Sequence, residues 1–302
     1  MARKDNSHLL AVTVACLFWG GSIISTKLSY DSLAPMSLGL IRFSLATILF
    51  FILVAFRHDL TPPTGRDLGL MAASGFLGTT LYFAAENYGA SLVSGATSSL
   101  VVGSFPAMTL VVECLADRKM PRLRVTLGIM FAFVGVCVLA FTEGTAAGSD
   151  ELLGIGILVL GGLCWAFYNL IMRSLAGKRS PLVITAWQTL FGALGFIPFA
   201  LVENAPLTGL STTAIGSLVY LVVCCTVAGF SLYNYGFEGL SPTIAASLVN
   251  LIPVVGLVLS ALILGEQISL TQIVGGIIVV AGIMLGSLPE KSQDDTANAQ
   301  AS

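Results

Sequence analysis

Two ionisable side chains lie inside long apolar stretches of the sequence and are the first candidates for chemistry. Arg42 falls within residues 35–56, and Glu86 falls near the end of residues 67–88. Charged groups are costly in lipid, so they face a protein interior or water and commonly mark a ligand or ion pathway. If the two side chains meet, they could anchor a zwitterionic substrate, act as a charge latch, or form a structural ion pair. Glu86 is also the candidate for proton coupling, because it is the most embedded acid away from a basic cluster.

Uncharged polar and aromatic side chains at nearby depths extend this set. Trp19 and Trp165 fall near the middle of their apolar stretches, whereas tryptophans that face lipid prefer the headgroup region. They could stack on a substrate or fill the centre of a helix bundle. Few charges among many aromatic groups fit a moderately polar ligand. The full set of candidates for a substrate cavity is Trp19, Arg42, Tyr82, Glu86, Trp165, Tyr168, Asn169, Gln188 and Tyr233.

The sequence contains no pattern that is typical of an enzyme. It has no HExxH, GxSxG or P-loop motif, and its six cysteines lie in apolar stretches without metal-ligand spacing. We therefore expect no catalytic residues, no metal and no cofactor. Because no nucleotide-binding domain is present either, any transport must be driven by a gradient.

Composition defines the elements that position these residues. Hydrophobic residues make up 56% and charged residues 10% of the chain, and the mean hydropathy is +0.92. An integral all-α membrane protein is therefore expected, since a span needs about 20 mostly apolar residues. Residues 1–8 and 288–302 are expected to be polar tails, the second of them disordered. An alternative for residues 9–28 is a cleaved signal peptide, because Arg3 and Lys4 precede this apolar run. The ten predicted spans are residues 9–28, 35–56, 67–88, 92–115, 123–141, 152–174, 181–202, 213–236, 242–264 and 270–287.

The distribution of Lys and Arg predicts the orientation. With the N-terminus inside, 12 of the 14 basic residues lie on the cytoplasmic side, whereas acidic residues such as Asp31 and Glu203 lie outside. The positive-inside rule then places both termini in the cytoplasm and the protein in the inner (plasma) membrane. The net charge of −2 gives no reason to expect a nucleic-acid partner. The lipid bilayer is the expected surrounding.

The second half of the sequence repeats the first. Asn87-Tyr88-Gly89 recurs as Asn234-Tyr235-Gly236, and Trp19, Pro35 and Pro106 have counterparts 146 or 147 positions later. We therefore expect two five-helix repeats, residues 9–141 and 152–287. Because five is odd, the second repeat must be inverted, and inverted repeats suit alternating access around a midplane site. An inert helical scaffold is the alternative interpretation.

These features together resemble a known family. The ten spans in two repeats, Trp19-Gly-Gly-Ser22, the small-residue helices with Pro106 and Pro253, and Leu264-Gly265-Glu266 are similar to the drug/metabolite transporter superfamily, EamA type. The first half departs from that pattern at Ala116-Asp117-Arg118-Lys119. The resemblance implies export or exchange of small organic metabolites, a central cavity between the repeats, and the fifth and tenth helices at the periphery.

Four residues are candidates for gating or hinges: Asn87, Asn234, Pro106 and Pro253. Asn and Gly commonly end helices, so Asn87 and Asn234 are expected to terminate the third and eighth helices at opposite gates. The two prolines are expected to bend their helices. A GxxxG pattern at Gly282–Gly286 allows a packing or dimer face, so the protein is expected to be a monomer or a weak homodimer.

The sequence therefore predicts a secondary transporter that moves a small organic metabolite, an amino acid or related compound, in the direction of export. Drug efflux and exchange of nucleosides or sugars are alternatives of the same class. A non-transporting scaffold and an intramembrane enzyme are alternatives from other classes. Possible proton coupling would involve Glu86.

Overall fold

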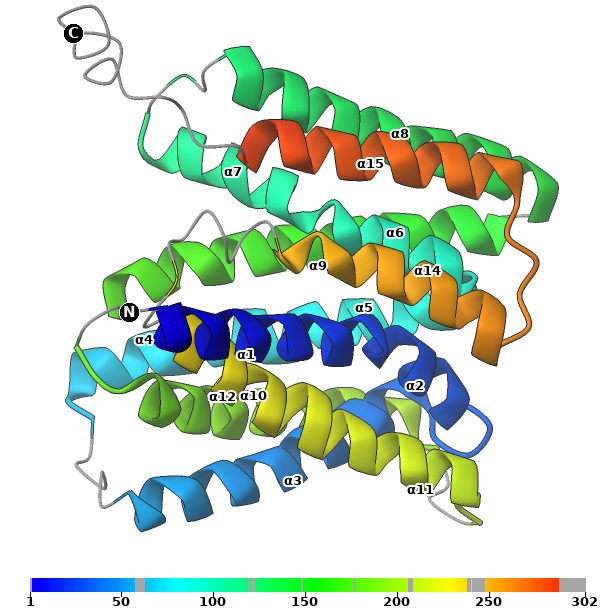
Figure 1. The fold of residues 1–302 in the computed structure, drawn as a ribbon. Coiled ribbons are helices and arrows are strands. Elements are labelled where there is room, and N and C mark those ends of the chain that lie inside the picture. The colour runs from blue at the N-terminus through cyan, green and yellow to red at the C-terminus, as the bar shows by residue number, and fades with distance from the viewer. Residues whose placement is uncertain are drawn as a thin grey trace, which may run out of the picture.

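The computed structural model describes residues 2–57, 63–118, 120, 123–147, 149–175, 178–205, 209–237, 240 and 248–287, and contains no strand among them. Its helices form a bundle in which α8 and α15 lie side by side along one edge and α3 lies along the opposite edge (Figure 1). The elements are α1 (Ala2–Gly20), α2 (Ser22–Ser29), α3 (Pro35–Phe56), α4 (Gly65–Gly75), η1 (Phe76–Leu81), α5 (Tyr82–Leu92), α6 (Gly95–Gly103), α7 (Phe105–Ala116), α8 (Leu123–Ala147), α9 (Ser149–Leu175), α10 (Pro181–Glu203), α11 (Thr212–Val219), η2 (Tyr220–Ala228), α12 (Gly229–Phe237), α14 (Leu251–Ile263) and α15 (Leu270–Ser287).

Within the described residues, seven continuous helical stretches are long and apolar enough to cross a membrane. They are Ser7–Ser29, Pro35–Phe56, Gly65–Leu92, Gly95–Ala116, Asp150–Leu175, Pro181–Glu203 and Thr212–Gly236. Three shorter apolar helices, Thr126–Val138, Leu251–Ile263 and Leu270–Gly282, lie where the fifth, ninth and tenth spans are predicted. The all-helical membrane fold is thus confirmed. Residues 2–8 continue the first helix, and residues 288–302 lie outside the described part of the chain.

Several helices begin where local chemistry favours a start. Pro35 and Pro181 each occupy the first turn of a helix, where the missing backbone donor has no intrahelical partner to lose. Ser94, Ser180 and Ser211 accept a backbone N–H with their side chains, as N-caps do. These starts follow directly from residue type.

Two long stretches contain a π-helical segment, η1 in one and η2 in the other. Their last residues, Leu81 and Ala228, are 147 positions apart, as are Thr79 and Thr226 within them. A π-helical segment leaves backbone groups less regularly paired and occurs frequently at functional sites. The two irregular segments therefore indicate that a functional site could lie at this depth of the bundle.

Asn87 and Asn234 do not end their helices, contrary to expectation. Helix α5 continues to Leu92 and α12 to Phe237. The nearby glycines instead permit close helix packing. A β-carbon at Gly89 would lie 3.0 Å from the carbonyl oxygen of Gly154 in α9, and one at Gly236 would lie 3.1 Å from that of His8 in α1. Because these glycines have no side chain, the backbone of the neighbouring helix can pack closely against them.

The contacts of Gly89 and Gly236 are made with residues that correspond to each other in the two halves of the chain. His8 and Gly154 are 146 positions apart, as are Val12 and Leu158, whose side chains approach Gly236 and Gly89. The packing of α5 on α9 and of α12 on α1 therefore uses corresponding residues.

Pro106 and Pro253 lie next to breaks in the helices. Helix α6 ends at Gly103 and α7 begins at Phe105, so Pro106 falls in the first turn after the interruption at Ser104. Pro253 falls in the first turn of α14, after the turn residue Asn250. The Pro253 ring also contacts the position of Gly103, where a β-carbon would lie 2.8 Å from it. The stretch of α6 and α7 and the stretch of α14 thus contact each other where Gly103 meets Pro253.

One end of the bundle, which we call the acidic end, is joined by side chains that cap helix termini. Glu203 accepts the N–H groups of Met36 and Ser37 at the start of α3, at 3.0 and 2.8 Å. Glu266 accepts those of Gly95 and Ala96 at the start of α6, at 2.8 and 3.1 Å. Each carboxylate connects segments far apart in the sequence, and negative charge is favourable at a helix N-terminus.

Lys27 adds a third cap at the acidic end. Its ammonium group donates to the carbonyl oxygens of Ala90 and Val93, at 3.0 and 2.6 Å, where α5 ends. Asp31 nearby accepts from the Ser211 hydroxyl at 2.6 Å, which links the end of α2 to the start of α11. The acidic end is therefore closed by hydrogen bonds between helices from both halves of the chain.

Glu266→Gln is expected to lower the stability of the protein by about 1–2 kcal/mol, because a neutral amide replaces a charged acceptor of two backbone donors. The Ser260 hydroxyl, which also donates to this carboxylate, would lose the same charge-assisted bond. Thermal unfolding of the purified protein in detergent measures the effect. Ser260→Ala should cost less than Glu266→Gln, and an unchanged midpoint for Glu266→Gln would contradict a capping role.

The opposite, basic end carries ion pairs whose side chains range from exposed to half-buried. Arg173 lies 3.1 Å from Glu113 and 3.3 Å from Asp117, and Lys178 lies 3.9 Å from Asp67. The pair of Arg173 with Asp117, which is exposed on both sides, contributes little. Among the residues described, the two ends of the bundle are thus closed by different kinds of contact.

Candidate functional site

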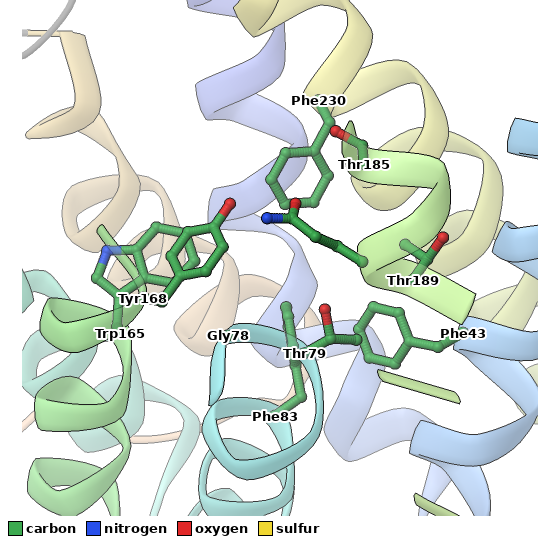
Figure 2. Close-up of a pocket in the computed structure, with 10 residues that line it drawn as sticks. Phe43, Gly78, Thr79, Phe83, Trp165, Tyr168, Thr185, Thr189 and Phe230 are labelled. Carbon is green, nitrogen blue, oxygen red and sulfur yellow. The ribbon is translucent and has the colours of Figure 1, made fainter. Parts of the chain in front are cut away.

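A small cavity lies at the centre of the bundle. Its volume is about 20 Å³, which is room for about one water molecule. Figure 2 shows aromatic rings and threonine side chains around it, from several helices. The lining residues come from α3, η1, α5, α9, α10 and α12: Phe43, Gly78, Thr79, Phe83, Trp165, Tyr168, Thr185, Gln188, Thr189 and Phe230.

Three predicted cavity residues, Trp165, Tyr168 and Gln188, line this cavity. Trp165 and Tyr168 lie one turn apart on α9, with ring centroids 4.9 Å apart. Figure 2 shows the two rings together on one side of the site. On its other side Trp165 contacts Tyr82, at 5.0 Å between centroids. Tyr82 therefore supports the wall of the cavity and does not line it.

Gln188 supplies an amide group to the cavity from α10. It is 4% exposed, and its Nε2 donates to the Ser74 hydroxyl at 2.8 Å and contacts the Met172 sulfur at 2.9 Å. Thr79 and Thr189 also line the cavity, and the Thr189 hydroxyl donates to the carbonyl oxygen of Ala186 in its own helix at 3.0 Å. This side of the site is polar and uncharged, and suits a neutral hydrogen-bonding group.

Arg42 lies behind the aromatic wall. It is 3% exposed, and its Nε donates to Thr226 Oγ1 at 3.1 Å. Its guanidinium carbon lies 5.1 Å from the ring centroid of Phe43 and 4.7 Å from that of Phe83, and both rings also line the cavity. Cation–π contacts of this kind stabilise a cation by about 0.5–2 kcal/mol.

Arg42 and Glu86 do not form an ion pair. No carboxylate oxygen among the described residues lies within 4.0 Å of the Arg42 guanidinium nitrogens. Glu86 is 3% exposed and accepts a hydrogen bond from the Tyr82 hydroxyl, one turn earlier on α5. Sequence spacing suggested proximity, but the side chains take different partners.

The other predicted cavity residues lie outside the lining. The Trp19 indole donates to the carbonyl oxygen of Cys225 in η2 at 2.8 Å and its ring contacts Tyr233, at 5.0 Å between centroids. Asn169 donates to the carbonyl oxygen of Trp165 in its own helix, at 2.8 Å. Trp19 and Trp165 thus hold different environments despite their corresponding positions in the repeat.

Asn87 bridges helices near the acidic end. Its side-chain amide donates to the carbonyl oxygen of Pro35 at 3.0 Å, and the backbone carbonyl of Asn87 accepts from the Tyr30 hydroxyl. Asn234 is half-buried in α12, near the end where the ring of Tyr235 stacks on His8. The two asparagines therefore lie toward opposite ends of the bundle.

Sequence reasoning missed the threonines and phenylalanines of the cavity. Thr79 and Thr226 are 147 positions apart, and Arg42 and Gln188 are 146 apart. Pairing polar residues by these offsets would have found Thr79. Nothing comparable indicates Phe43, Phe83 or Phe230, because phenylalanine is common throughout the apolar stretches. No group of three or more potential metal ligands occurs in the described part of the chain.

A bundle of apolar helices with a polar cavity at its centre is the architecture of a membrane transport protein. The chain belongs to the EamA-like transporter family, whose model matches residues 6–141 and 152–288. It is therefore a multi-pass membrane transporter, and we place it in the inner (plasma) membrane. The resemblance inferred from the sequence is confirmed.

Individual relatives cover almost the whole chain. An "Uncharacterized transporter" of Archaeoglobus fulgidus is 27% identical over 92% of this chain and 96% of its own. The "Probable amino-acid metabolite efflux pump" of Escherichia coli is 24% identical over 94% and 95%. The "Probable terminal-alkyne amino-acid exporter" of Streptantibioticus cattleyicolor is 23% identical over 93% and 94%. A solved crystal structure shares the fold, with a TM-score of 0.67 and 16% identity over 93% of this chain and 98% of that one.

Proposed function

We propose that this protein is a secondary transporter that exports an amino acid or a related small metabolite by alternating access. The observation that carries the proposal is the central cavity, where polar side chains from α9, α10 and η1 meet an aromatic wall with a buried cation behind it. A buried polar site inside an apolar helix bundle is costly unless it serves a ligand. The cavity is small, so a substrate would require the surrounding helices to separate.

Two inverted five-helix repeats, residues 9–141 and 152–287, would provide that motion. The corresponding contacts of Gly89 with α9 and Gly236 with α1 support the repeat, and so do the two stretches matched by the family. With ten spans, both termini would be cytoplasmic, and the acidic end would face outward. The state described here would then be closed on the outside, and opening it would separate the caps made by Glu203, Glu266 and Lys27.

The choice of substrate class is supported by the relatives that are named as amino-acid exporters and by the chemistry of the site. Arg42 is suited to a carboxylate, and aromatic rings with hydroxyl and amide groups are suited to a moderately polar remainder. Nothing in the proposal needs a cofactor.

Flux measurements in liposomes that contain only this protein test the proposal. Counterflow of a labelled amino acid is the expected result, with drug-like cations and nucleosides or sugars as comparison solutes. If solutes of only one comparison class are transported, that class would replace amino acids as the proposed substrate. The absence of flux for the whole panel would favour a scaffold.

Glu86→Gln is expected to abolish the pH dependence of net transport and to leave counterflow intact, because counterflow needs no proton movement. Glu86 is buried and accepts a hydrogen bond from the Tyr82 hydroxyl. Uptake driven by imposed pH gradients, compared with counterflow at one pH, measures the two properties separately. Unchanged pH dependence in the variant would remove Glu86 from the coupling mechanism.

A further inference from the structure

Two corresponding polar sites flank the aromatic wall of the cavity. The arginine site consists of Arg42 from α3 and Thr226 from η2, which are hydrogen-bonded at 3.1 Å. The glutamine site consists of Gln188 from α10 and Thr79 from η1, which line the cavity together. Arg42 and Gln188 are 146 positions apart, and Thr226 and Thr79 are 147 apart. Each site therefore combines the same two positions of the repeat, one taken from each half of the chain.

The two sites differ in charge. In the described part of the chain, Arg42 has no carboxylate within 4.0 Å and makes one hydrogen bond, through Nε. Its terminal nitrogens carry four N–H donors that this bond does not use. A buried cation is normally paired, because leaving the charge uncompensated in an apolar interior is costly. Gln188, in contrast, is neutral and already donates to Ser74.

The wall between the sites consists of Phe43 and Phe83. Their ring centroids lie 4.7 Å apart, both rings line the cavity, and the Arg42 guanidinium lies over both. The rings stabilise the cation less than a carboxylate would, since a bidentate, charge-assisted pair is the stronger interaction for arginine. A ligand carboxylate that enters from the cavity and moves the two rings apart would reach the unused N–H donors of Arg42.

We propose that the substrate carries a single carboxylate, which binds Arg42 after Phe43 and Phe83 move apart, and an uncharged polar or aromatic side chain, which occupies the cavity at Gln188 and Thr79. This inference rests on the proposed transport function and adds that the binding site has one charged end and one neutral end. One pole is cationic and the other is neutral, so the substrate binds in one orientation with its carboxylate toward α3 and η2. A dicarboxylate would place a second charge against the neutral Gln188 site.

The experiment compares each amino acid with its own carboxamide, which removes the negative charge and keeps the rest of the molecule. L-phenylalanine with L-phenylalaninamide and L-threonine with L-threoninamide are two such pairs. Thermal stabilisation of the purified protein reports binding, because a ligand that binds the folded state raises its unfolding temperature. The wild-type protein should prefer the acid by about tenfold or more in the concentration for half-maximal stabilisation, as expected for loss of a buried charge-assisted pair.

Three variants locate the preference. Arg42→Gln should remove the discrimination between acid and amide, and Arg42→Lys should keep part of it because the charge remains without the planar fork. The exchange variant Arg42→Gln/Gln188→Arg should regain a preference for the acid, because it moves the cation to the corresponding site. The exchange variant and Arg42→Lys keep the test decisive if Arg42→Gln alone fails to fold.

Several outcomes would overturn the inference. These are equal stabilisation of the wild-type protein by acids and amides, a preference that survives Arg42→Gln, or no stabilisation by either member of any pair. Liposome flux distinguishes this failure from that of the proposed function. Flux of solutes that lack a carboxylate would refute the polarity of the site and leave transport standing, whereas absence of all flux would refute transport itself.

Discussion

Gly78→Leu is expected to reduce transport by about 5- to 140-fold, since overfilling a packed site costs about 1–3 kcal/mol and each 1.4 kcal/mol is tenfold in affinity. Gly78 lies in η1 on the wall of the cavity, opposite the Tyr168 ring. A β-carbon there would lie 2.3 Å from Tyr168 Cδ2, so even the first added atom forces the ring, which lines the cavity, to shift. Figure 2 shows both residues beside the central space. Counterflow in liposomes measures the loss.

Gly69→Leu is the matched control for that experiment. Gly69 lies earlier in the same helical stretch, on α4, and a β-carbon there meets no atom within 4 Å. The control variant should transport at a rate close to the wild-type protein. Normal counterflow by a folded Gly78→Leu variant would show that the substrate does not pass this cavity and would require another path through the bundle.

Gly282→Leu is expected to destabilise the protein by about 3 kcal/mol, at the upper end of the usual cost of overpacking. A β-carbon at Gly282 would lie 2.6 Å from both the backbone nitrogen of Ala132 and the carbonyl oxygen of Gly128 in α8. These are backbone atoms, so no side-chain rotation can relieve the clash. The two helices would have to separate along the edge of the bundle that Figure 1 shows. Thermal unfolding in detergent measures the change.

Gly156→Leu is the control for the packing experiment. Gly156 is exposed on α9, and a β-carbon there meets nothing within 4 Å. Its effect should stay within about 0.5 kcal/mol, as for most surface substitutions. The contact also changes the meaning of the GxxxG pattern, because Gly282 faces α8 of its own chain. An unfolding temperature unaffected by Gly282→Leu would return that glycine to the set of candidates for a dimer face.

Residue types and their periodicity were sufficient to predict the class of the protein. Long apolar stretches without charges must form helices that satisfy their own backbone in lipid. Pro35 and Pro181 marked helix starts because a first turn tolerates a missing donor. The family resemblance followed from the order of its motifs and is borne out over residues 6–141 and 152–288.

Part of the candidate site was predictable for the same reason. Trp165, Tyr168 and Gln188 are polar or aromatic groups at a depth where lipid disfavours them, and the structure places them on the cavity. Trp19, Asn169 and Tyr233 satisfy the same rule but lie elsewhere, because residue type and depth do not define which face of a helix a side chain occupies. The phenylalanines carried no signal, since they are ordinary residues of an apolar helix.

By itself, then, the sequence determined a helical membrane transporter, the approximate positions of its helices, and the buried status of Arg42 and Glu86. Tertiary structure alone decided their partners: Arg42 lies over Phe43 and Phe83 and bonds Thr226, while Glu86 bonds Tyr82. It also decided that Asn87-Tyr88-Gly89 lies within a helix, in which Gly89 packs against Gly154 of α9. The physical reason is common to both results. Burial cost depends on the residue itself, whereas contact partners depend on the rotation and crossing of helices that are distant in the chain.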